Sequence, residues 1–176
     1  MHIVGEQVIL RAIERADLPS FLAWSNDPEI AVQLGEIHFP TSQSQHDRWF
    51  DRIDTDEKSI RLAVTDKSNR LIGYSGFWGL NWRARHAEHA VVIGDSASRS
   101  AGFGSDVIWA CAKHAFEQLD LQRLYCNILA TNTVSLACYQ SCGFQIEGTL
   151  RKHQFRNNSR VDQIVLGLLR SEFASV

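Results

Sequence analysis

The order of strands and helices between residues 86 and 143 limits the fold of this chain more than any other feature. Residues 86–95 and 121–130 have strand-like patterns, and a helical pattern follows each of them. In the first helix, from Ser105 to about Leu119, the apolar residues recur at helical spacing along one face. Gly143 is a suitable residue to end the second helix. A strand–helix–strand unit in the middle of the chain predicts an α/β domain.

The flanking segments indicate that the sheet is mixed. Residues 6–13 are expected to form a first strand, residues 59–66 and 70–80 a hairpin, and residues 144–152 and 160–169 two closing strands. Two helices are expected near the N-terminus. Asp17 is a candidate N-cap of the first, which ends at Asn26–Pro28, and Ser42 with Gln45 resembles a capping box for the second. Since no linker or repeat divides residues 1–176, we expect a single α/β (α+β) domain.

Composition excludes several classes of protein. The 176 residues carry a net charge of −2, which gives no electrostatic footprint for nucleic acid. We see no signal peptide and no apolar run long enough to span a bilayer, so we expect a cytoplasmic protein without a membrane partner. The four cysteines form no C-x-x-C pair, and we expect reduced, buried thiols rather than a metal site.

The segment RSAGFGSD, residues 99–106, places glycines at the start of the expected helix. Glycines let a ligand approach the unpaired N–H groups of a helix N-terminus closely. The amides of Gly102, Phe103, Gly104 and Ser105 are therefore candidates to hold a phosphate, with Arg99 as a counter-charge. The spacing R-x-x-G-x-G fits neither a P-loop nor a dinucleotide fingerprint. An ordinary connecting loop is the alternative.

A line of polar residues follows on the second helix. Asn132, Ser135 and Tyr139 are spaced i, i+3 and i+7, which places them in one narrow stripe. An amide, a hydroxyl and a phenol in such a stripe indicate a helix that faces a ligand. The alternative is a capping Asn, a surface Ser and a half-buried Tyr.

Together, R-S-A-G-F-G and the later N-x-x-S-x-x-x-Y-x-x-x-G-F resemble the GCN5-related N-acetyltransferase (GNAT) superfamily. The segments WSNDPEI and CGFQIEGTLR are similar to its RimJ/RimL-like and SpeG-like branch. The resemblance implies a GNAT-like domain with a mixed, mostly antiparallel sheet, a splayed central strand pair and flanking helices. It also implies direct transfer of an acetyl group from acetyl-CoA to a primary amine, and a possible homodimer.

The resemblance also implies which residues hold the cofactor. The amides of the glycine loop and Arg99 would bind the pyrophosphate, and the strand before the loop would run beside the pantetheine arm. The cofactor-binding residues implied in this way are Val92, Ile93, Arg99, Gly102, Phe103, Gly104, Ser105, Asn132 and Ser135.

Tyr139 matches the general acid of the family, and a phenol is suited to protonate a departing thiolate. Glu88 is the candidate base, water relay or amine anchor. His89 is a weaker candidate base because strand alternation points it to the other face. Trp24 and Trp82 are candidates to line the acceptor site.

The resemblance leaves the acceptor amine open. We favour a protein N-terminal amine, as in RimJ/RimL-like enzymes. The alternatives are a small-molecule amine, such as spermidine or an amino sugar, and a non-catalytic acyl-CoA-binding module. Arg83 and Arg85, beside Trp82, argue against a purely acidic polyamine pocket.

Overall fold

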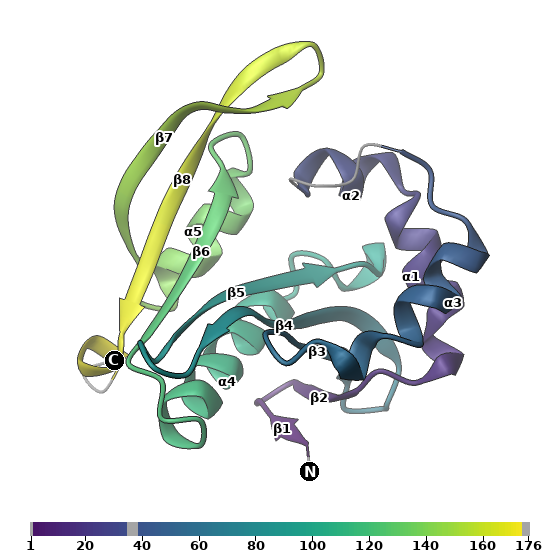
Figure 1. Cartoon of the computed structure of the whole chain (residues 1–176), viewed down its shortest axis with the longest axis horizontal. Helices are drawn as coiled ribbons and strands as arrows, with labels where there is room; N and C mark the ends of the chain where they lie inside the picture. Colours follow the sequence, from purple (N-terminus) through teal and green to yellow (C-terminus); the bar gives the residue numbers. More distant parts are fainter. Residues whose placement is uncertain (1, 35–38, 174–176) are drawn as a thin grey trace.

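The computed structural model describes residues 2–34 and 39–173 and contains one eight-stranded sheet (Figure 1). The strand order is β1-β2-β3-β4-β5-β6-β8-β7, and only β5 and β6 are parallel neighbours. The expected mixed, mostly antiparallel sheet is therefore confirmed. The strands are β1 (Ile3–Val4), β2 (Val8–Ala12), β3 (Ile60–Asp66), β4 (Leu71–Asn81), β5 (His86–Ile93), β6 (Arg123–Leu129), β7 (Gln145–Arg156) and β8 (Ser159–Leu169).

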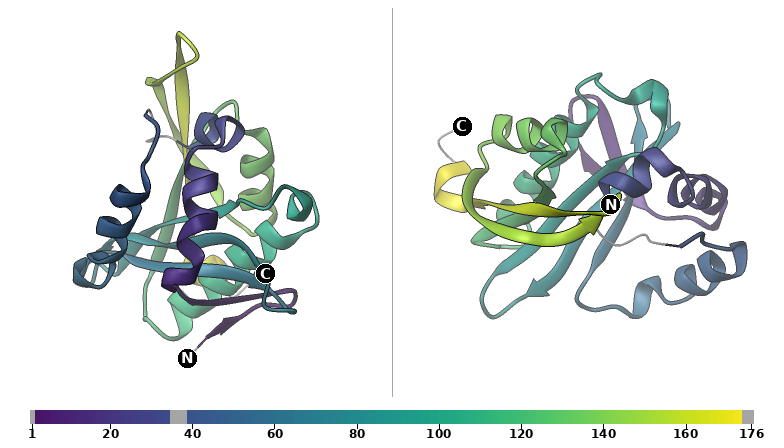
Figure 2. Two further views of the ribbon diagram at one scale, coloured as in Figure 1. Left: turned by 90° about the vertical axis from the view of Figure 1, so that its right-hand side faces the viewer. Right: turned by 90° about the horizontal axis from the view of Figure 1, so that it is seen from above.

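Helices cover both faces of this sheet. In Figure 2, α4 and α5 lie on one side of the sheet and α3 lies on the other. The predicted helices near residues 17–25, 41–53, 105–119 and 131–143 are all present. The α-helices are α1 (Leu18–Ser25), α2 (Pro28–Gln33), α3 (Gln43–Phe50), α4 (Phe103–Glu117), α5 (Thr133–Ser141) and α6 (Arg170–Phe173).

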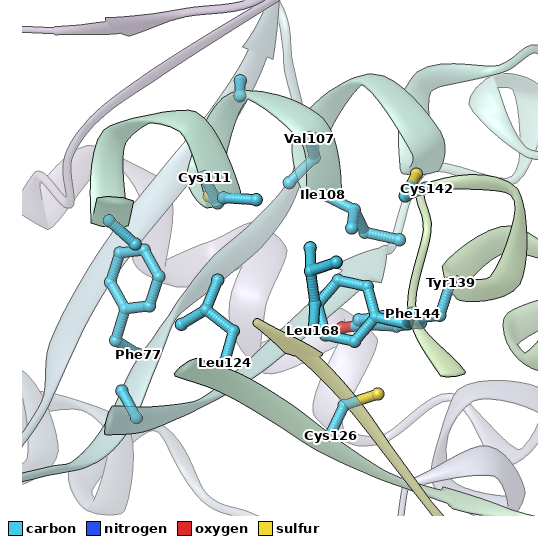
Figure 3. Close-up of a cluster of buried hydrophobic side chains, with 14 of the residues drawn as sticks. Phe77, Val107, Ile108, Cys111, Leu124, Cys126, Tyr139, Cys142, Phe144 and Leu168 are labelled. Carbon is cyan, nitrogen blue, oxygen red and sulfur yellow. The ribbon is translucent and has the colours of Figure 1, made fainter. Parts of the chain in front are cut away.

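The main core lies between α4 and the sheet. The predicted apolar face of α4 is buried: Ile108, Ala112, Ala115 and Phe116 are almost completely covered. Figure 3 shows Val107, Ile108 and Cys111 from α4 pointing toward Phe77, Leu124 and Leu168 from the strands. A smaller cluster on the other face joins Phe21 of α1 with Ala63 and Tyr74 of the sheet. Each helix thus buries one apolar face against the sheet, which contributes most of the favourable free energy of folding.

The central parallel pair opens into a V. β5 pairs with β6 only at His86↔Arg123, Ala87↔Leu124 and Glu88↔Tyr125. Beyond Glu88, β5 stays paired with β4 as far as Ile93, whereas β6 pairs with β8 as far as Leu129. Figure 1 shows the two strands diverging. The splayed central pair implied by the family resemblance is confirmed.

Local sequence signals behave as expected in the second predicted helix and differently in the first. Ser42 and Gln45 form the predicted capping box at the start of α3. Pro28, however, does not only end α1: it also begins α2, because Asp27 accepts a hydrogen bond from the Glu29 amide at 2.8 Å and proline is well suited to the first helical turn. The short elements β1 and α6 were not expected.

Cys111, Cys126 and Cys142 are buried free thiols, and Cys138 is half-buried. In the described part of the chain, no helix is both long and apolar enough to cross a membrane.

Candidate active site

A cavity of about 1020 Å³ opens where β5 separates from β6. Its walls come from α2, the end of β5, the loop before α4, and α5. It gathers most of the predicted site residues from segments that are far apart in the sequence. The predicted residues that line it are Val92, Ile93, Arg99, Gly102, Gly104, Ser105, Asn132, Ser135 and Tyr139. Phe103 instead packs against the main core.

The glycines let the loop pass close to α5. Gly102 is the N-cap of α4 and has a φ of 85°, a left-handed conformation that strains any residue with a side chain. A Cβ on Gly104 would lie 3.4 Å from Cys138 Sγ on α5. The Ser105 hydroxyl also contacts this sulfur, at 3.2 Å. The N-terminus of α4, with its unpaired amides and positive dipole end, is therefore part of the cavity wall.

Asp106, in the first turn of α4, anchors the segment between β1 and β2 to this helix. Its carboxylate accepts hydrogen bonds from the backbone N–H groups of Glu6, Gln7 and Val8, at 2.9, 2.7 and 3.0 Å. Gly5 passes so close that a Cβ there would lie 2.6 Å from an Asp106 oxygen. The glycine loop is thus tied to the N-terminal strands through the helix that it begins.

Arg99 has protein partners that the sequence did not indicate. Its guanidinium lies 3.1 Å from the Glu29 carboxylate and 3.7 Å from that of Asp27, both at the start of α2. It also donates to the backbone carbonyls of Ile93 and Gly94. Arg99 therefore joins α2 to the end of β5 at the edge of the cavity, and a bound anion would have to share it with two carboxylates.

The polar stripe on α5 contains a capping residue, and it also faces the cavity. Asn132 caps the helix, because its side chain accepts a hydrogen bond from the Ser135 amide at 3.1 Å. Asn132, Ser135 and Tyr139 nevertheless all line the cavity. Capping and facing a ligand are compatible here.

Tyr139 is buried, with 2% of its surface exposed. Its hydroxyl lies 2.9 Å from His89 Nδ1 and donates to the His89 carbonyl at 3.2 Å. Burial raises the pKa of Tyr139 well above its usual value. The phenol is therefore protonated at neutral pH, as a general acid must be.

Glu88 lies on the opposite face of β5 from His89, as strand alternation predicts. Its Oε1 accepts a hydrogen bond from Asn127 Nδ2 at 3.0 Å. In the sheet, Glu88 is the direct neighbour of Trp78 on β4 and of Tyr125 on β6. Sequence reasoning missed Tyr125 and Asn127, because only the register of β6 places them beside this carboxylate.

His89 is unsuited to be the base for an acceptor on the Glu88 face. Its ring is 1% exposed, and burial lowers its pKa to about 3. Its two ring nitrogens contact Tyr139 and Ser75. It belongs to the same side of the sheet as Tyr139.

The two predicted acceptor-site tryptophans lie outside the set of residues that line the cavity. Trp24 packs against the backbone of Gly94, where a Cβ would lie 2.1 Å from its ring, and against Phe21. Trp82 is 54% exposed in the turn before β5, at the end of that strand away from the cavity. Neither is among the described residues that line the cavity, and their role at the acceptor site stays a prediction.

Comparison with known protein families identifies the family of this chain. Residues 7–145 match the model of the acetyltransferase (GNAT) domain. The chain belongs to the GNAT acetyltransferase family. It is an acetyl-CoA-dependent N-acetyltransferase.

Two curated relatives and one solved structure extend over nearly the whole acetyltransferase. The N-acetyltransferase YokL of Bacillus subtilis is 26% identical over 96% of this chain and 93% of its own length. The spermidine N(1)-acetyltransferase of Vibrio cholerae is 26% identical and is matched over 97% of both chains. A crystal structure of spermidine N-acetyltransferase from Vibrio cholerae, in complex with CoA and spermine, has a TM-score of 0.89 at 25% identity. That match covers 97% of this chain and 99% of the other.

Proposed function

We propose that this acetyltransferase acetylates a small polyamine, such as spermidine or spermine. The observation that carries the proposal is the likeness, over almost the full length of both chains, to a Vibrio cholerae enzyme in complex with CoA and spermine. The protein N-terminal amine favoured from the sequence is less well supported than this alternative. Arg85, in the turn before β5, weighs less against it than the sequence suggested, because its charge is paired with Asp120 at 3.1 Å.

The donor half of the proposed site is the cavity. A volume of about 1020 Å³ suits a large cofactor such as acetyl-CoA. The backbone amides at residues 102–105 would hold the pyrophosphate at the N-terminus of α4, where unpaired N–H groups and the helix dipole favour an anion. Val92 and Ile93 would line the path of the pantetheine arm, and Asn132 and Ser135 would contact it from α5.

The acceptor half is the opposite face of the sheet at the point of the V. Glu88 supplies a carboxylate, and Trp78 and Tyr125 are its cross-strand neighbours. Carboxylates and aromatic faces both attract ammonium groups, so this row suits an alkylamine. Asn127 holds Glu88 in place by its hydrogen bond to Oε1.

The two halves place an acid and a base on opposite faces of β5. We infer that Glu88, directly or through a water, removes a proton from the attacking amine as its nitrogen bonds to the acetyl carbon. The carbon–sulfur bond then breaks with its electron pair on sulfur, and the Tyr139 hydroxyl gives its proton to that sulfur. Exchange with solvent after product release returns the proton from Glu88 to Tyr139.

A thiol-release assay with acetyl-CoA and an acceptor panel tests the proposal. The panel contains spermidine, spermine, an amino sugar, and peptides that begin with Ala or Ser, and mass spectrometry identifies the acetylated product. We expect the highest kcat/KM for a polyamine. A higher value for a peptide or an amino sugar would contradict the polyamine assignment. Binding of acetyl-CoA without turnover on any amine would instead indicate a non-catalytic acyl-CoA-binding module.

A further inference from the structure

A chain of buried polar contacts runs from Tyr139 into the sheet. The Tyr139 hydroxyl is 2.9 Å from His89 Nδ1, and His89 Nε2 is 3.1 Å from the Ser75 hydroxyl. Ser75 in turn donates to the Ala90 carbonyl at 2.8 Å. All three side chains are at most 2% exposed. A buried polar network of this kind is costly unless its members are paired, which they are here.

The contact distances indicate the state of the His89 ring, because each hydroxyl has one proton and directs it at its nearer acceptor. Ser75 Oγ is 2.8 Å from the Ala90 carbonyl and 3.1 Å from Nε2, so its proton points to Ala90 and Oγ accepts from His89 Nε2–H. The Tyr139 oxygen is nearer to Nδ1, at 2.9 Å, than to the His89 carbonyl, at 3.2 Å. His89 is neutral at physiological pH, because burial lowers its pKa to about 3. Its Nδ1 therefore carries a lone pair and accepts from the Tyr139 hydroxyl.

We propose that His89 is the positioning residue of Tyr139: its Nδ1 holds the phenol oxygen beside β5, at the point where β5 leaves β6, and keeps the phenol protonated. This inference rests on the proposed role of Tyr139 as general acid. The single phenol proton points mainly at the nearer acceptor, the ring Nδ1 at 2.9 Å, and the His89 carbonyl at 3.2 Å is a second, longer acceptor. Both repel a phenolate, so the proton stays on Tyr139 until a developing thiolate competes for it.

The rings around this pair restrict where they can move. Phe77 packs against His89 with ring centroids 5.8 Å apart, and Phe144 packs edge-on against Tyr139 at 5.0 Å. Figure 3 shows Tyr139 and Phe144 side by side next to the core. A proton donor needs a fixed distance to its acceptor, and this packing together with the His89 contact supplies it.

Two amide substitutions at residue 89 test the Nδ1 contact with Tyr139 separately from the Nε2 contact with Ser75. In His89→Asn the amide occupies the place of Nδ1 and can still accept from Tyr139. In His89→Gln the amide reaches the place of Nε2, keeps the Ser75 contact and loses Tyr139. We expect His89→Gln to lower kcat about tenfold, equivalent to about one hydrogen bond, with little change in either KM. We expect His89→Asn to retain most of kcat. Equal kcat losses in the two folded variants would overturn the proposal.

A double-mutant cycle distinguishes positioning from a merely structural role. Tyr139→Phe is expected to lower kcat about 100-fold. If His89 acts through Tyr139, adding His89→Gln to Tyr139→Phe causes no further loss, whereas an additional tenfold loss would refute the proposal. Full activity of Tyr139→Phe would refute the role of Tyr139 as general acid, and no acetyl transfer by the wild type to any amine would refute the proposed function.

A measurement on the wild type tests the network even if the residue 89 variants fail to fold. In the ¹⁵N NMR spectrum of the imidazole, we expect His89 to show a protonated Nε2 and an unprotonated Nδ1 at pH 7. The Nδ1 resonance should shift in Tyr139→Phe. A protonated Nδ1 would show that the donor and acceptor roles assigned to this network are wrong.

Discussion

Because Asp106 anchors the N-terminal strands to helix α4, we expect a single substitution of this residue to lower the free energy of unfolding substantially. Asp106→Ala removes both acceptor oxygens from three backbone N–H donors. The Val8 amide belongs to a residue that is completely buried, so leaving it unpaired costs about 1–3 kcal/mol. The exposed Glu6 and Gln7 amides can turn to water, and each loses about 0.5–1 kcal/mol.

The sum is a loss of about 3 kcal/mol in the free energy of unfolding, which for a chain of this size lowers Tm by roughly 6–12 °C. Urea unfolding followed by circular dichroism measures it. Glu117→Ala, at an exposed carboxylate near the other end of the same helix, is the matched control and should change stability by less than about 0.5 kcal/mol. If Asp106→Ala also stays within about 0.5 kcal/mol of wild type, the carboxylate does not anchor the N-terminal segment.

Three further predictions follow from the site. Gly104→Val should raise the Kd for acetyl-CoA at least about tenfold in calorimetry, because the side chain meets Cys138 and covers the amides, and normal binding would contradict the proposed donor site. Glu88→Gln should lower kcat about 100-fold in thiol release while acetyl-CoA binding is unchanged, and unaltered kcat would remove Glu88 from the chemistry. His89 has a pKa of about 3 in the folded protein and 6.5 when unfolded, so the unfolded state takes up its proton first as the pH falls below 6.5. Its contribution to stability is therefore complete above pH 6.5, and about 2 kcal/mol of it is lost by pH 5. Urea midpoints at pH 7 and pH 5 should show a smaller pH dependence in His89→Asn than in wild type, and equal dependences would exclude this origin.

The sequence predicted those parts of the fold that depend on local chemistry. Helix α4 has an apolar face at helical spacing, and Ser42 with Gln45 caps α3 through neighbouring residues. The end of α1 before Pro28 was predicted correctly, but α2 was missed, because a proline both follows the end of one helix and suits the first turn of the next. The choice between these roles depended on the side chain of Asp27.

The site could be predicted only in part, because strand register and long-range contacts complete it. Nothing in the local sequence places Tyr125 beside Glu88, or His89 against Tyr139 fifty residues away. The salt bridge between Arg99 and Glu29 spans 70 residues in the same way. Trp82 lies in the turn before β5, at the opposite end of the strand from the cofactor cavity, and its role at the acceptor site stays a prediction.

The three register pairs between β5 and β6 have a consequence for the cooperativity of unfolding. They are the only strand pairing, in the described part of the chain, between β1–β5 on one side and β6, β8 and β7 on the other. The sheet is thus two plates joined at one corner, and helix α4 is the second link between them, because its core contacts reach Phe77 in one plate and Leu124 and Leu168 in the other. A ligand in the cavity contacts β5 of the first plate and α5, which follows β6 of the second, so binding should make the two plates unfold more nearly as one unit.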